Sequence, residues 1–147
     1  MAMSFRGICV RYFYGVSWGA LAFALAACST QHHGAAPANG RTIFQTGQDS
    51  RGKAISASPR PLYSSCGACH GATGAGGVRL PGGAVSADLR HAALVTRQKH
   101  PYTTALLERA IARGIDNEGQ RLNAVMPRWR MNARDLRDVA RYVKTLK

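Results

Sequence analysis

The chain has 147 residues, a length that predicts one domain and argues against a multidomain protein. Lysine and arginine number 20 against 7 acidic residues, which gives a formal net charge of +13. A charge this basic suits acidic proteins, anionic lipid or nucleic acid, but the sequence holds no nucleic-acid recognition motif, so we exclude nucleic acid as the partner.

The N-terminus has the pattern of a secretory signal peptide. Arg6 and Arg11 precede any acidic residue, and an apolar stretch runs from Gly15 to Ala27. That stretch is too short to span a bilayer comfortably, and a buried helix is the alternative interpretation. We therefore expect residues 1–27 to be removed on export.

The sequence at the end of this leader, Leu25 to Cys28, resembles the lipobox of bacterial lipoproteins. The resemblance implies that Cys28 receives a diacylglycerol thioether and anchors the mature chain to a membrane, because each buried methylene contributes about 0.8 kcal/mol. Cleavage after Ala27 without lipid is the alternative. Ser29 after the cysteine favours the outer membrane, on the periplasmic side of the envelope. Residues 28–38 have no hydrophobic period and predict a flexible tether.

A cysteine pair followed by a histidine lies at the centre of the chain, in the stretch SSCGACHG. Cys9 leaves with the leader and Cys28 is assigned to lipid, so Cys66 and Cys69 are the cysteines left for the folded domain. Their spacing alone is compatible with a disulfide, half of a zinc site, a thioredoxin-like redox pair or covalent haem attachment.

Three of these hypotheses lack support elsewhere. A zinc site needs four ligands, and His91 and His100 stand far apart and unpaired. A thioredoxin-like pair needs strands that the flanking sequence does not predict, and a disulfide leaves His70 unexplained. The C-x-x-C-H pattern is that of c-type haem, in which two thiols on one helical turn add to the vinyl groups and His70 lies under the iron. We predict one haem c per chain.

After the C-x-x-C-H motif, the sequence predicts a glycine-rich loop and then two helices. Residues 71–83 are glycine-rich and have no period, which allows tight turns close to a flat ligand. A helix is predicted between Pro101 and Gly114 from an apolar stripe at Leu106, Leu107, Ala110 and Ile111. A last helix is predicted after the N-cap residue Asn132, with Asp135 in its first turn and a stripe at Leu136, Val139, Ala140 and Val143.

From about Asn39 to Lys147 the chain resembles the class I cytochromes c. The resemblance rests on Gly40 and Phe44 of a first helix, on CGACHG, and on the Met-Pro loop and final helix in MPRWRMNARDLRDVARYVKTL. It implies an all-α cytochrome c fold over residues 39–147, with short helices packed around one covalently attached haem.

The sequence departs from this family at two places. The segment between the first helix and the haem motif is longer than in compact members. The usual Pro-Asp-Leu is replaced by Ala87-Asp88-Leu89, which leaves Pro81 as a candidate for the residue whose backbone carbonyl orients the proximal imidazole.

The sixth iron ligand has four candidates, Met126, Met131, His91 and His100. Met131 has a structural explanation, because it precedes the N-cap and is placed to pack on Leu136. Met126 precedes Pro127 and matches the Met-Pro loop of the family, so we assign it as the ligand. A histidine ligand is the alternative.

These assignments predict an electron carrier and not an enzyme. With histidine and methionine filling both axial positions, one electron enters or leaves through the haem edge, in a free carrier or in the cytochrome subunit of a dehydrogenase or oxidase. A haem enzyme or ligand sensor with an open or displaceable distal site is the alternative. We expect Arg121, Arg128, Trp129 and Arg130 to form a docking surface for acidic redox donors and acceptors, or otherwise a solvated basic surface.

Overall fold

The computed structural model describes residues 36–147. The predicted signal peptide (1–27), the lipidation site Cys28 and most of the predicted tether lie outside the described residues. The first helix, α1, begins at Ala36, so helical structure starts before the boundary expected at residue 39. Among the helices of the described part, none combines the length and the apolar character that a membrane span requires.

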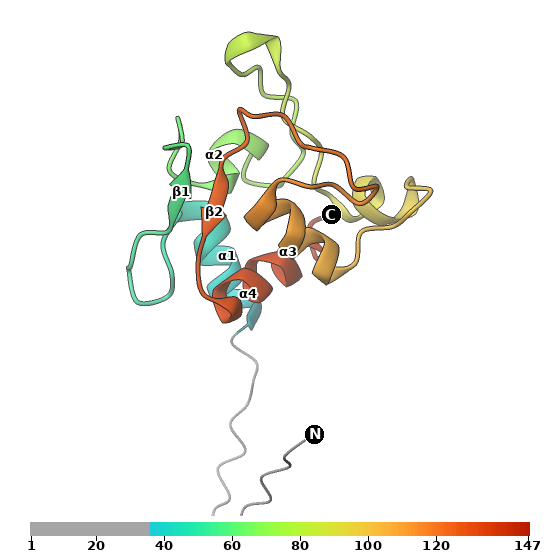
Figure 1. Ribbon diagram of the computed structural model, residues 1–147. Helices are drawn as coiled ribbons and strands as arrows, with labels where there is room; N and C mark the ends of the chain where they lie inside the picture. Colours follow the sequence, from blue (N-terminus) through green and yellow to red (C-terminus); the bar gives the residue numbers. More distant parts are fainter. Residues whose placement is uncertain (1–35) are drawn as a thin grey trace, which may run out of the picture. The chain divides into compact units, whose positions relative to one another are not determined.

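Short helices joined by long loops make up this part of the chain (Figure 1). The elements in order are α1 Ala36–Thr46, β1 Ser56–Ser58, α2 Cys66–His70, the 3-10 turn η1 Pro81–Gly83, the π-helical turn η2 Ala92–Thr96, α3 Thr104–Arg113, β2 Arg128–Arg130 and α4 Ala133–Val143. The helical architecture agrees with the sequence prediction, whereas the short β1–β2 sheet is a feature that the sequence patterns do not predict.

The helices α3 and α4 are capped by residues whose side chains suit those positions. The Thr103 hydroxyl accepts a backbone hydrogen bond at 3.2 Å from the first turn of α3, and Gly114 ends that helix in the left-handed conformation, at φ 64°. The Asn132 side chain accepts from the backbone N–H of Asp135 at 2.9 Å and donates to the Asp135 carboxylate at 2.7 Å. The predicted N-cap at Asn132 and the predicted end at Gly114 are confirmed, while Thr103 and not Pro101 opens α3.

The helices α1 and α4 cross in direct backbone contact (Figure 1). A Cβ atom on Gly40 would lie 2.9 Å from Tyr142 Cβ and closer still to the Asp138 carbonyl oxygen, so only glycine fits at the crossing. One turn further along, the rings of Phe44 and Tyr142 pack at a centroid distance of 5.5 Å. Phe44 and Val139 are fully buried there, at 0% exposure, and form the centre of the core.

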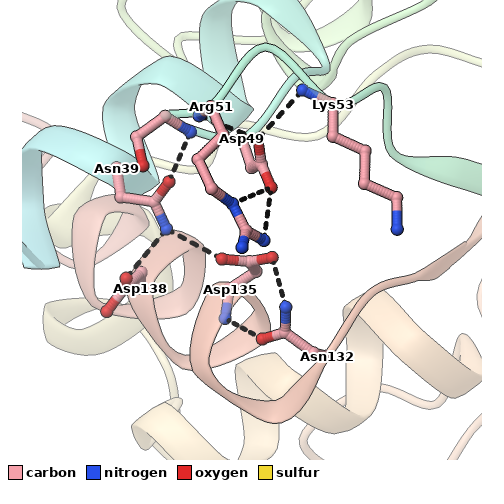
Figure 2. Close-up of polar contacts among 8 residues, drawn as sticks. Asn39, Asp49, Arg51, Lys53, Asn132, Asp135 and Asp138 are labelled. Carbon is pink, nitrogen blue, oxygen red and sulfur yellow. Dashed lines mark hydrogen bonds and ion pairs between the residues drawn. The ribbon is translucent and has the colours of Figure 1, made fainter.

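A buried polar cluster joins the same two helices (Figure 2). The Asn39 side-chain nitrogen donates to the carboxylates of Asp135 at 3.0 Å and Asp138 at 2.9 Å, and its oxygen accepts from the backbone N–H of Ser50 at 2.9 Å. Asn39 thereby supplies hydrogen bonds to two buried carboxylates and fixes the rotation of α1 against α4.

The long segment between α1 and α2 is held at two points. The Asp49 carboxylate accepts from the backbone N–H of Lys53 at 2.9 Å and from the Arg51 guanidinium at 3.0 Å, and these hydrogen bonds hold the pKa of Asp49 below its usual range (Figure 2). Further along, β1 pairs antiparallel with β2, with Ala57 opposite Trp129. Because Trp129 belongs to the core, this pairing closes the segment onto the domain.

We expect Gly40→Ala to destabilise the domain by about 1–3 kcal/mol, because the added methyl group forces the two helix backbones apart. Chemical denaturation followed by circular dichroism measures this loss. Arg41→Ala is the matched control, since Arg41 is the next residue of α1 and is exposed, and its effect should stay within about 0.5 kcal/mol. Equal stability of Gly40→Ala and the parent protein would contradict the close contact.

Candidate functional site

The cysteine pair lies on its own short helix, α2, which packs beside α1. Ser65 caps α2, since its buried hydroxyl accepts a backbone hydrogen bond from the first turn at 3.2 Å. Gly67 faces α1, where a Cβ would lie 3.2 Å from the Phe44 carbonyl oxygen. Cys66 and Cys69, three residues apart, therefore share one face of a helix that is fixed against the core.

Both of these cysteines are free thiols. Burial raises the pKa of the Cys66 thiol to about 12 and also raises the pKa of Cys69. Catalytic dithiols of the thioredoxin type have a lowered pKa, because the thiolate is the reactive form. The environment of this pair therefore argues against a thiol–disulfide exchange site.

His70, at the end of α2, is oriented by one backbone carbonyl. Its Nδ1 lies 2.8 Å from the carbonyl oxygen of Ala87. Since a carbonyl oxygen can only accept, Nδ1 carries the proton and Nε2 keeps a free lone pair, which is the state of a metal-ligating imidazole. Burial lowers the pKa of His70, with the Ala87 hydrogen bond acting in the opposite direction, so the ring favours its neutral form.

Pro81, the candidate for this carbonyl, does not supply it, because the acceptor is Ala87. Pro81 lies in η1, at the tip of an irregular hairpin, and Ala87 lies on the returning arm. The arms are joined by backbone hydrogen bonds of 2.9 Å, from Gly77 N–H to the Ser86 carbonyl and from Ser86 N–H to the Val78 carbonyl. The residue that replaces the proline of the family pattern thus keeps the position from which its carbonyl can accept the imidazole proton.

Charged neighbours hold the returning arm in place. The Asp88 carboxylate pairs with the guanidinium of Arg90 at 2.8 Å and with that of Arg97 at 3.3 Å. Hydrogen bonds from Arg90, together with the charges of both arginines, hold the pKa of Asp88 well below its usual range. Asp88 therefore stays ionised at neutral pH and fixes the backbone next to Ala87.

A cavity of about 780 Å³ opens beside α2, within the range of roughly 300–1,000 Å³ that is common for cofactor sites. Cys66, Cys69, His70 and Met126 all line it. Much of the remaining wall is apolar and includes Phe44, Leu94, Leu107, Ile111, Val139 and Val143. A thiol pair and a neutral imidazole on an apolar wall are the groups that attach and ligate a covalently bound haem, and a thioether is a suitable further ligand, so the residues present fit haem c.

Position relative to this cavity distinguishes Met126 from the other candidates for the sixth ligand. Met126 lines it, whereas Met131, His91 and His100 are not among the lining residues. His91 and His100 are exposed, and Met131 is half-buried against the edge of the core, just before the N-cap of α4. The geometry therefore brings Met126 to the same space as Cys66, Cys69 and His70.

The residues expected to form a docking surface are not all exposed. Trp129 is only 5% exposed and is part of the core, so the expectation that it contacts a partner is wrong. Arg128 is half-buried, and its guanidinium donates to backbone carbonyls of the chain itself. Arg121 and Arg130 are exposed.

The structure adds residues that the sequence interpretation missed. Leu62, Tyr63 and Val85 are large, exposed apolar side chains that line the cavity mouth. A signal for two of them was the Leu62-Tyr63 pair inside a segment otherwise rich in polar and small residues. Ala87 carries no sequence signal of its own beyond its place in the altered Pro-Asp-Leu pattern.

Comparison with known proteins gives one result. A protein-family model described as cytochrome c matches residues 37–147, which is most of the chain and nearly all of the described part. No curated protein and no solved structure gives a significant match.

We expect Gly76→Ala to disturb His70 more than Gly77→Ala does. Both glycines have positive φ angles, 69° and 80°, so both substitutions carry a similar backbone strain. A Cβ on Gly76, however, would lie 2.5 Å from the Ala87 carbonyl carbon, whereas one on Gly77 meets nothing within 4 Å. Haem content per chain after expression in a host that matures c-type cytochromes should fall several-fold for Gly76→Ala only. Equal haem content in the two variants would show that the Ala87 carbonyl does not control His70.

Proposed function

This chain belongs to the cytochrome c family, and we propose on that basis that it is a single-electron carrier whose haem iron is held by one histidine and one methionine. Membership of the family confirms the expected fold of short helices and the expected covalently attached haem c. When bound, haem c supplies an iron centre that takes up and releases one electron.

On the proximal side, Cys66 and Cys69 would form the two thioether bonds to haem c, and His70 would provide Nε2 to the iron. The assignment is supported by the C-x-x-C-H spacing, by the shared cavity wall, and by the Ala87 carbonyl that keeps the proton on Nδ1.

On the distal side, Met126 provides its thioether sulfur. The observation that carries this proposal is that, of the four candidate ligands, Met126 is the one that lines the cavity with His70. A thioether ligand raises the reduction potential relative to a second histidine. With His70 and Met126 both holding the iron, the chain would leave no open site for a substrate, and the chemistry that haem c would supply is electron transfer.

The partners that suit this chain are redox proteins with an acidic docking face. Leu62, Tyr63 and Val85 give the cavity mouth an exposed apolar rim, and exposed Arg60 and Arg79 lie in the same two loops. An apolar centre with a basic margin favours fast, transient association with an acidic protein, because charge speeds encounter while the contact area stays small. Arg121 and Arg130 add to the positive surface.

We further propose that the mature chain is anchored through lipid on Cys28, on the periplasmic side of a bacterial envelope. The support lies in the lipobox-like Leu25 to Cys28 and in the apolar leader before it. Ser29 favours the outer membrane.

Replacing Met126 by alanine should abolish the sulfur-to-iron charge-transfer band of the ferric protein, because the sulfur ligand is removed. The same variant should turn high-spin and bind cyanide readily, as in a haem enzyme with an open distal site. Absorption spectroscopy of the purified ferric protein, before and after cyanide addition, measures both effects.

Met131→Ala is the matched control for this experiment. It should keep the band and lose at most about 2 kcal/mol of stability, because Met131 is only half-buried. A parent protein that is already high-spin, or a Met126→Ala variant that keeps its band, would favour the ligand-sensing or enzymatic alternative.

Cys28→Ser should move the protein from the membrane to the soluble periplasmic fraction without changing its haem spectrum, since Cys28 lies far from the haem motif in the sequence. Detergent phase separation of cell fractions, with haem absorbance as the label, measures this redistribution. A parent protein that partitions into the aqueous phase would instead support cleavage after Ala27 without lipid.

A further inference from the structure

We propose that Arg128 is a positioning residue for Met126, and that its guanidinium clamps the loop of residues 122–126 so that the Met126 sulfur stays at the iron. The proposal rests on the proposed function, since it assumes Met126 as the sixth ligand. It gives Arg128, which was expected to face a partner, a role inside the domain.

The backbone of Arg128 is fixed from both sides. Arg128 is the first residue of β2 and pairs with Ser58 of β1. The neighbouring residues Pro127 and Trp129 are both buried. The Arg128 side chain therefore starts from a rigid point immediately after the loop that carries Met126.

The Arg128 guanidinium reaches back to two carbonyl groups of that loop. Nη1 donates to the carbonyl of Met126 itself, and Nη2 donates to the carbonyl of Leu122 at 3.2 Å. These acceptors lie at the two ends of the loop, so one planar cation joins them. Hydrogen bonds from a charged donor are stronger than those between neutral groups, so this fork is a strong polar contact between β2 and the loop.

Inside the loop, Asn123 makes a complementary turn. Its side-chain oxygen accepts from the backbone N–H of Val125 at 2.9 Å, and its carbonyl accepts from the backbone N–H of Met126 at 3.1 Å. The peptide groups before and after Met126 are thus held from opposite directions, by Asn123 within the loop and by Arg128 from β2.

Gly114 provides the space for the guanidinium. A Cβ on Gly114 would fall within 3.0 Å of the Arg128 guanidinium carbon, so the side chain lies directly against the backbone at the end of α3. The Gly114 carbonyl also accepts from the backbone N–H of Leu122 at 2.9 Å. The partial negative charge at the C-terminal end of a helix favours a cation at this place. The end of α3, the ligand loop and β2 therefore meet at Arg128.

The consequence for the site is a firmer iron–sulfur bond. A neutral thioether is a weak ligand, so its occupancy at the iron depends on how closely the chain holds the sulfur in position. If the clamp is lost, an added ligand such as imidazole competes more easily with Met126.

The test measures imidazole binding to the full-length, haem-loaded ferric protein by absorbance. In Arg128→Ala we expect the apparent dissociation constant for imidazole to fall by about tenfold or more, and the charge-transfer band to weaken, with haem content unchanged. The dissociation constant of Arg128→Lys should lie between those of Arg128→Ala and the parent, because one ammonium group cannot bridge both carbonyls with the same geometry. Arg113→Ala, an exposed arginine in the last turn of α3 beside Gly114, is the control and should leave both quantities unchanged.

A double variant separates the clamp from other effects. If Arg128 acts through Met126, Arg128→Ala should have no further effect on imidazole affinity when Met126 is already alanine. If Arg128→Ala raised the imidazole affinity of the Met126→Ala protein by the same factor as in the parent, the proposal would be overturned. That result would mean that Arg128 controls access to the iron. An Arg128→Lys or Arg128→Ala protein that is less stable but binds imidazole like the parent would also overturn it.

Failure of the proposed function gives a different result. If Met126→Ala alone keeps the charge-transfer band, the sixth ligand is not Met126, whatever Arg128 does.

Gly114→Ala provides an independent check on the clamp, because its Cβ displaces the guanidinium and should reproduce the weakened band of Arg128→Ala. An unchanged band in Gly114→Ala would contradict the packing on which the clamp depends.

Discussion

The backbone contact between α1 and α4 at Gly40 is the constraint on which the rest of the domain depends. It allows Phe44 and Val139 to meet at the centre of the core, and both side chains also line the cavity. Phe44 in turn lies beside Gly67, so the helix that carries the cysteine pair is positioned by the same crossing. The Asn39 cluster fixes the rotation of the two helices, which a glycine contact alone leaves free.

Around this crossing, backbone carbonyls position the two proposed axial ligands in different ways. His70 is held by a hydrogen bond from its Nδ1–H to the Ala87 carbonyl, which a glycine-rich hairpin and the ionised Asp88 keep in place. The Met126 side chain has no N–H or O–H group, so this residue is held through its backbone, whose carbonyl accepts from Arg128. An imidazole can be oriented directly through its second nitrogen, whereas a thioether has no donor and is a weak acceptor, so the backbone that carries it has a larger part in its positioning.

Local patterns were sufficient for the parts of the fold that short-range physics controls. The stripes of α3 and α4, the Asn132 cap and the end of α3 at Gly114 follow from helix geometry and from capping, which involve residues a few positions apart. The attachment motif is equally local, because both thiols and the imidazole lie within one short helix. Met126 was singled out by its place before a proline and by the likeness of its loop to a family.

The sequence by itself determined helices α3 and α4 and the cofactor chemistry, because these depend on residues close together in the chain, and it indicated the family through motifs spread from Gly40 to the final helix. The tertiary structure decided which carbonyl meets His70, since Ala87 lies 17 residues away and reaches it only through the hairpin. It also decided the roles of Trp129 and Arg128. A tryptophan between two arginines has the pattern of an exposed basic surface, but pairing with β1 turns the ring into the core and leaves one arginine facing the ligand loop. That outcome depends on a strand about 70 residues earlier, and such long-range pairing leaves no local signal.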